Sequence, residues 1–167
     1  MTLFDTHAHY DDEAFDADRD AVLAAFDGLV IDPGCTLASS QAAVDLTARH
    51  SHVYAAVGIH PENCGDFVPE HMDALRQLAR EPKVVAIGEI GLDYYWPENP
   101  PHDFQQQVFR AQLELALELD LPVIVHDREA HGDSLAIVKE YPALRGVFHC
   151  YSGSVEMARE LLALGWY

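Results

Sequence analysis

Cysteine and positive charge are both scarce in this chain of 167 residues. The three cysteines, Cys35, Cys64 and Cys150, lie far apart and form no CxxC pair, so we expect free thiols rather than a disulfide framework or a thiolate zinc site. Ten lysines and arginines stand against 28 aspartates and glutamates, which gives a formal net charge of −18. This charge excludes a broad basic surface for nucleic acid, and a substrate with phosphates would need positive charge from bound metal ions or a few arginines in one cleft.

Long apolar runs are also missing from the sequence. No run approaches the roughly 18 residues that a membrane-spanning helix needs. The first residues do not combine a basic region with an apolar one, as a secretory leader would. We therefore expect no membrane segment and, by default, a cytoplasmic location.

The sequence does contain a regular alternation of short apolar runs and longer amphipathic segments. With 49% hydrophobic residues, 23% charged residues and no low-complexity linker, we expect a single domain over residues 1–167. The apolar runs are continuous and rich in β-branched residues, which is typical of buried parallel strands. They cover residues 2–6, 29–32, 53–59, 84–89, 122–126 and 146–149, and a seventh run starts near Leu164. Helical patterns cover residues 15–26, 37–49, 69–80, 104–119, 134–141 and 155–164. This alternation predicts an α/β fold with a mainly parallel sheet.

Histidines and one glutamate gather at the ends of four of these apolar runs. His7 and His9 are two residues apart on the first predicted strand, so their side chains point to the same face. Glu89, His126 and His149 each close a later run. The carboxyl ends of parallel strands meet at one edge, and in a (β/α)8 barrel this edge carries the active site. A lone histidine at a strand end is commonly a surface residue, but four histidines and a glutamate in this position together predict a metal site.

The ligand types narrow the choice of metal. Imidazole and carboxylate suit zinc, manganese, iron or nickel, and an acid placed between two groups of histidines can bridge a pair of ions about 3.5 to 4 Å apart. We therefore expect two divalent ions, with Zn, Mg, Mn, Fe and Ni as the candidates. Five other histidines have no such strand-end position and are left out of the site: His50, His52, His71, His102 and His131.

Five motifs give the chain a family resemblance. They are Asp5-Thr6-His7-Ala8-His9, Gly58-Ile59-His60-Pro61, Gly88-Glu89-Ile90-Gly91-Leu92-Asp93-Tyr94, His126-Asp127-Arg128 and Phe148-His149-Cys150-Tyr151-Ser152-Gly153. In content and order they strongly resemble the TatD family of metal-dependent deoxyribonucleases. The resemblance implies a TIM-barrel fold of the metal-dependent hydrolase type, and metal-assisted hydrolysis of DNA in degradation or repair. It also implies that the metal ligands are His7, His9, Glu89, His126 and His149, with Glu89 bridging.

Two residues outside this ligand set are candidates for contact with substrate. His60 follows a buried strand and faces the same edge, where it would contact a phosphate or act as an acid; the alternative is a structural loop histidine. Arg128 lies two residues past His126 and would contact a phosphate; the alternative is a surface arginine. The catalytic candidates are therefore Glu89, His60 and Arg128.

Three loop segments allow two interpretations each. Asp93 and Tyr94 would support the site or contact substrate, or simply pack in their loop. Ser152 and Gly153 would hold an anion at a helix start, unless Ser152 or Ser154 is only an N-cap. The aromatic run at residues 94–97 would stack on nucleic-acid bases, and packing on the barrel is the interpretation we favour.

The sequence contains only part of the barrel that the resemblance implies. Six strands and the start of a seventh are expected, whereas a TIM barrel has eight, and the family's remaining aspartate belongs on the last strand. We therefore expect the ion at His7 and His9 to be weakly bound or missing, and the open sheet to favour self-association. The sequence is either a fragment, which we favour, or a shortened product that closes its barrel with a second copy.

Three functions remain open at this point. The leading one is a metal-dependent DNA hydrolase, an exonuclease that acts on single strands or frayed ends. The second keeps the metal site but acts on a small phosphoester, amide or ester, which the net charge of −18 favours. The third is a weakly active metal-binding remnant, which the absent aspartate favours.

Overall fold

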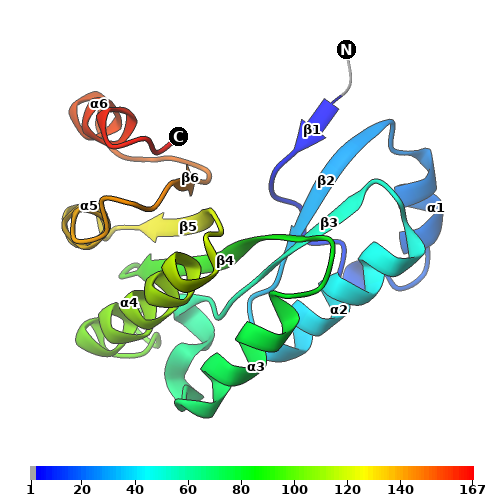
Figure 1. Ribbon diagram of the computed structural model, residues 1–167, viewed down its shortest axis with the longest axis horizontal. Helices are drawn as coiled ribbons and strands as arrows, with labels where there is room; N and C mark the ends of the chain where they lie inside the picture. Colours follow the sequence, from blue (N-terminus) through cyan, green and yellow to red (C-terminus); the bar gives the residue numbers. More distant parts are fainter. Residues whose placement is uncertain (1–2) are drawn as a thin grey trace.

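Six parallel strands, arranged in sequence order, form the framework of the protein (Figure 1). The computed structural model describes residues 3–167, so Thr2, the first residue of the first predicted strand, lies outside the described residues. Each strand pairs in parallel with its sequence neighbours, which confirms the predicted α/β fold with a parallel sheet. The strands are β1 (Leu3–Asp5), β2 (Gly28–Pro33), β3 (Val53–Val57), β4 (Val84–Asp93), β5 (Val123–Arg128) and β6 (Gly146–Phe148).

Helices connect the strands and lie on the outer side of the curled sheet (Figure 1). They are α1 (Arg19–Ala25), α2 (Leu37–Arg49), α3 (Glu70–Leu78), α4 (His102–Leu119), α5 (His131–Lys139) and α6 (Val155–Ala163), with short 3₁₀ turns η1 (Glu13–Phe15) and η2 (Pro61–Asp66). No helix within residues 3–167 is long and apolar enough to cross a membrane.

The hydrophobic core fills the space between the sheet and the outer helices. Val57, Ile87 and Ile90 of the strands and Leu113 of α4 have no exposed surface. Burying each such side chain contributes about 1.5 to 3 kcal/mol. The helices cover the outer face of the sheet, and the side chains on its inner face are apolar as well, so the strands are continuous apolar runs in the sequence.

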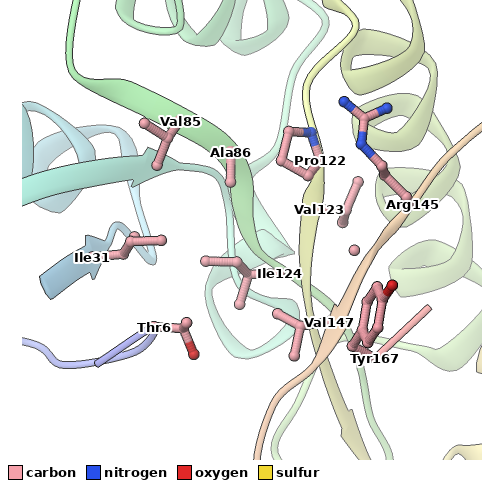
Figure 2. A pocket seen from close by; sticks show the side chains of 11 residues that line it. Thr6, Ile31, Val85, Ala86, Pro122, Val123, Ile124, Arg145, Val147 and Tyr167 are labelled. Carbon is pink, nitrogen blue, oxygen red and sulfur yellow. The ribbon is translucent and has the colours of Figure 1, made fainter. Parts of the chain in front are cut away.

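The sheet stops short of a closed barrel. Beyond β6, Trp166 forms an isolated parallel bridge to Gly146, which is where the seventh strand was expected to start. The inner face of the curl carries a cavity of about 260 Å³ lined mainly by apolar side chains, among them Ile31, Ala86 and Ile124 (Figure 2). The structure therefore agrees with the expected incomplete barrel.

Two strands are longer than the sequence predicted, which changes the position of the site residues. Strand β4 continues past Glu89 to Asp93, so Glu89 lies inside the strand rather than at its end. Strand β5 likewise continues past His126 to Arg128. A register shift between β4 and β5 at residues 87–90 interrupts the regular pairing around Glu89, and the pairing then resumes and continues to Asp93 and Arg128.

Helix starts also differ in detail from the sequence prediction. The expected helix at residues 15–26 is shorter than predicted, since η1 ends at Phe15 and α1 begins only at Arg19. The start of α6 follows Ser154, whose side chain accepts a hydrogen bond from the Met157 amide at 3.1 Å. Ser154 is therefore the N-cap that was weighed against an anion site.

Candidate metal centre

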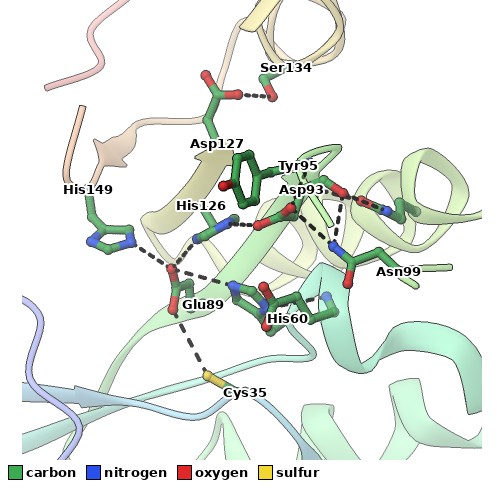
Figure 3. Close-up of polar contacts among 12 residues, drawn as sticks. Cys35, His60, Glu89, Asp93, Tyr95, Asn99, His126, Asp127, Ser134 and His149 are labelled. Atoms are coloured by element: carbon green, nitrogen blue, oxygen red, sulfur yellow. Dashed lines mark hydrogen bonds and ion pairs between the residues drawn. The ribbon is translucent and has the colours of Figure 1, made fainter. Parts of the chain in front are cut away.

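The carboxylate of Glu89 lies at the centre of the carboxyl edge of the sheet and is 3% exposed (Figure 3). Its Oε2 atom faces the segment after β1. It is 3.3 Å from Nε2 of His7 and 3.6 Å from Nε2 of His9, and the two Nε2 atoms are 3.0 Å apart. Nitrogen and oxygen ligands bind Zn²⁺ at about 2.0 to 2.2 Å, which places neighbouring ligand atoms at such separations. This group therefore has the spacing of a shared ion site.

The other oxygen of Glu89, Oε1, faces the opposite side of the site. It is 2.7 Å from Nε2 of His149, 3.0 Å from Nδ1 of His126 and 3.8 Å from Nε2 of His60. Ligand atoms of His60, Glu89 and His126 all lie within 4.8 Å of one another. The five predicted ligands are thus brought together, with the Glu89 carboxylate between two groups of histidines.

The histidines hold the Glu89 side chain in its charged form. Burial acts to raise the pKa of Glu89, but hydrogen bonds from His126 and His149, followed by those from His7 and His9, hold this pKa well below its usual range. In return, Asp11 and Glu89 raise the pKa of His9 to about 10. The buried Glu89 carboxylate thus supplies the negative charge that a cation-binding site requires, and a metal ion would bind the neutral form of the imidazoles in place of their protons.

His60 differs from the other histidines in its hydrogen bonds. Its Nδ1 accepts the backbone N–H of Glu62 at 3.2 Å, so a neutral ring carries its proton on Nε2, which points toward Glu89. Burial lowers the pKa of His60 to about 4, which leaves the ring neutral at pH 7. In this state His60 is a hydrogen-bond donor.

Asp93 ties one ligand to the loop that follows β4. Its Oδ2 is 2.9 Å from Nε2 of His126, while its Oδ1 accepts the Tyr95 amide at 3.0 Å and the Asn99 side chain at 3.1 Å. Asp93 thus has the supporting position that the sequence suggested. Tyr94 packs away from the site, since its ring stacks on His102 at 3.6 Å.

Arg128 lies on the rim of a cavity next to the centre. The cavity measures about 330 Å³ and is lined by His126, Asp127, Arg128, His149, Cys150 and Ser152. The guanidinium carbon is 3.9 Å from the ring centre of Tyr95 and 5.3 Å from that of Trp96. Within residues 3–167 it forms no ion pair, so its charge is free to meet an anion.

An acidic pair beside His9 was missed by the sequence analysis. Asp32 ends the apolar stretch of β2, is fully buried, and neither of its carboxylate oxygens has a hydrogen-bond partner. Nδ1 of His9 is 3.8 Å from Oδ1 of Asp11, and ligand atoms of all three residues lie within 4.8 Å of one another. Burial, and then Asp11, raise the pKa of Asp32 to about 8. The rule that found Glu89, a polar residue closing an apolar run, also points to Asp32.

The histidines that were left out of the site stay outside the ligand groups found among residues 3–167. His50 instead pairs with Asp20 at 2.8 Å, and His131 pairs with Asp127 at 2.8 Å.

Comparison with known proteins identifies the family. The model of the "TatD related DNase" family matches residues 4–167. The chain belongs to this family. The relationship confirms the resemblance in the motifs, and the family is one of metal-dependent hydrolases.

The relatives of this TatD-family chain include an uncharacterized hydrolase and proteins named as exonucleases. An uncharacterized metal-dependent hydrolase, YabD of Bacillus subtilis, is 38% identical over 99% of this chain and 67% of its own length. The 3'-5' ssDNA/RNA exonuclease TatD of Citrobacter koseri is 36% identical over 99% of this chain and 65% of its own length. The chain therefore spans about two thirds of the length of these relatives.

Solved structures show the same fold. YjjV, a TatD homologue from Escherichia coli K12, superposes with a TM-score of 0.90 at 33% identity, covering 98% of this chain and 66% of YjjV. A TatD-family hydrolase from Entamoeba histolytica gives a TM-score of 0.88 at 25% identity, covering 99% of this chain and 64% of that protein. The six-stranded curl is thus the corresponding part of a TatD-type TIM barrel.

Proposed function

We propose that this chain supplies the metal centre of a hydrolase that cleaves phosphodiester bonds of single-stranded DNA, as an exonuclease. The observation that carries the proposal is the Glu89 carboxylate, whose two oxygens face two separate groups of histidines. Support for the substrate comes from relatives that are named 3'-5' ssDNA/RNA exonucleases.

The donor set fits two divalent ions. His7, His9 and Glu89 would hold one, and Glu89, His126 and His149 would hold the other, with Zn, Mn, Fe, Ni or Mg as candidates. Ions bound in this way lower the pKa of a coordinated water and neutralise charge on a phosphoryl group. His7 has a buried Nδ1 atom with no hydrogen-bond partner, and its Nε2 is directed at Glu89.

The residues of the chain itself orient the ligands and the phosphate. Asp93 fixes the ring of His126 through its Nε2, so the opposite nitrogen, Nδ1, faces Glu89. His60, neutral at pH 7, donates from Nε2 to a phosphate oxygen rather than acting as an acid. Arg128 offers its unpaired guanidinium to a phosphate at the cavity rim.

A small phosphoester is the second candidate substrate. The cavity beside His126 and His149 is about 330 Å³, a volume suited to a small molecule. The net charge of −18 repels a long polyanion from a distance, whereas a small ester carries little charge to repel.

The test uses metal-loaded protein and a single-stranded DNA labelled at its 5′ end. We expect stepwise shortening that a chelator stops and that Glu89→Gln abolishes, while Glu81→Gln, a change of an exposed glutamate, has no effect. Cleavage that survives the chelator or the loss of Glu89 would contradict the proposal. Hydrolysis of bis(p-nitrophenyl) phosphate without any shortening of DNA would favour the small phosphoester.

A further inference from the structure

Tyr95 and Trp96 lie against Arg128, which lines the cavity, and we call these three residues the rim stack. The Arg128 guanidinium lies over the Tyr95 ring, and the rings of Tyr95 and Trp96 meet edge to face with centres 4.7 Å apart. Tyr95 is 49% exposed and Trp96 is 42% exposed. Both rings therefore keep a large exposed surface, although the loop that carries them packs on the barrel through backbone contacts with Asp93 and Arg128.

The backbone fixes the rim stack relative to the metal centre. The amide of Tyr95 donates to Asp93, whose other carboxylate oxygen contacts His126. The amide of Tyr94 donates to the carbonyl oxygen of Arg128 at 2.9 Å. A group bound at the rim stack would thus be held in a defined position beside His126. Figure 3 shows the Tyr95 ring above His126 and Asp93.

The charge at the rim suits a phosphate. Arg76 and Arg110 are each paired with a carboxylate at less than 3.0 Å, whereas Arg128 has no ion pair within residues 3–167. Stacking on Tyr95 leaves the edges of the guanidinium plane available for bidentate contact with phosphate oxygens. Tyr95 is in this arrangement a positioning residue for Arg128.

We propose that the rim stack is a nucleotide subsite, in which Trp96 stacks on a nucleobase and Arg128 binds the adjoining phosphate. This inference rests on the proposed phosphodiesterase function, because it names the part of the substrate that lies next to the cleaved bond. A Trp ring accepts any base, so the subsite carries no sequence preference. Bases inside a duplex are already stacked, so the subsite selects unpaired nucleotides.

The kinetic test compares two phosphodiesters with the same leaving group. One is thymidine 5′-(p-nitrophenyl phosphate), which carries a base, and the other is methyl p-nitrophenyl phosphate, which carries none. We expect wild type to have the lower KM for the thymidine ester. Trp96→Ala should reduce this preference about tenfold, within the range that base stacking supplies, and Trp96→Phe should restore most of it. An unchanged preference in Trp96→Ala would overturn the inference while leaving the proposed hydrolase intact.

A binding measurement separates the subsite from turnover. The anisotropy of a labelled oligothymidylate and of an abasic strand of equal length is followed with the metal-loaded protein. We expect wild type to bind the base-bearing strand about tenfold more tightly, and Trp96→Ala to lose this difference even if the chain hydrolyses neither strand. Tyr167→Ala removes an exposed aromatic ring away from Arg128 and is the matched control. Equal binding of both strands by wild type would overturn the subsite.

Discussion

Replacement of Asp32 by asparagine should make the free energy of unfolding of the metal-free protein less sensitive to rising pH. Asp32 is fully buried without a hydrogen-bond partner, and its pKa is raised to about 8 by burial and by Asp11. The folded protein therefore keeps this proton up to pH about 8, whereas the unfolded chain loses it near 3.8. Between these pH values the folded state binds more protons, so the free energy of unfolding falls as the pH rises.

The size of the effect follows from the two pKa values. At pH 7 the unfolded carboxyl lies about 3 pH units above its own pKa, while the folded carboxyl is still protonated, and at 1.36 kcal/mol per unit this costs about 4 kcal/mol. At pH 5 the same reasoning gives a cost of about 2 kcal/mol. The cost of about 4 kcal/mol at pH 7 is large compared with a typical domain stability of about 5 to 15 kcal/mol.

The assay is urea unfolding followed by far-UV circular dichroism, in the presence of a chelator, at several pH values from 5 to 7. An asparagine cannot ionise, so the gap in unfolding free energy between Asp32→Asn and wild type should move in favour of the variant by about 1.36 kcal/mol per pH unit, or about 2.7 kcal/mol over this interval. Asp27→Asn, which replaces an exposed aspartate, is the control and should follow wild type. Parallel pH profiles for Asp32→Asn and wild type would refute the reasoning.

Three further predictions concern the centre, the sheet and the open face. Zn²⁺ or Mn²⁺ should raise the melting temperature of wild type but not of Glu89→Gln, because the two oxygens of Glu89 face both groups of histidines. Equal increases in melting temperature for the two proteins would contradict this. Gly91→Ala should lower the unfolding free energy by about 2 kcal/mol or more, because the φ angle of Gly91 is 145° and an added Cβ would overlap the carbonyl oxygen of His126. The control is Gly132→Ala, which should be neutral because an added Cβ there meets no atom within 4 Å. An unchanged urea midpoint for Gly91→Ala would show this wrong. The apolar inner face should cause self-association in size-exclusion chromatography with light scattering, and a strictly monomeric, cooperatively folding chain would refute that expectation.

Much of the fold was readable from the sequence because the strands of a parallel sheet of this type carry apolar side chains on both faces. The strands and α2 appear where the apolar runs and the helical periodicity place them. The extension of β4 was not readable, since Gly88 and Gly91 flank Glu89 and resemble a strand end. In the structure the pairing with β5 shifts register at residues 87–90, and the strand continues to Asp93.

The composition of the site was readable, but its internal arrangement was not. Strand-end positions are enough to bring His7, His126 and His149 to one edge. They do not reveal which oxygen of Glu89 faces which histidine, because that depends on the curvature of the sheet. They also do not reveal that Trp96 keeps much of its surface exposed, since an exposed aromatic and a buried one look alike in a loop sequence.

The rings of His7 and His149 show how strongly the sheet bends. They belong to segments that follow β1 and β6, which are five strand spacings apart and would be separated by about 24 Å in a flat sheet. Their ring centres are nevertheless 3.7 Å apart, with planes inclined by 3°. A small decrease in curvature at each pair of strands would add up across the sheet. The two rings would then separate although the hydrogen bonds between every pair of strands remained intact. The distance between these two rings therefore depends on the curvature of the sheet, and binding of a ligand at the two histidines is sensitive to mutations anywhere along the six strands.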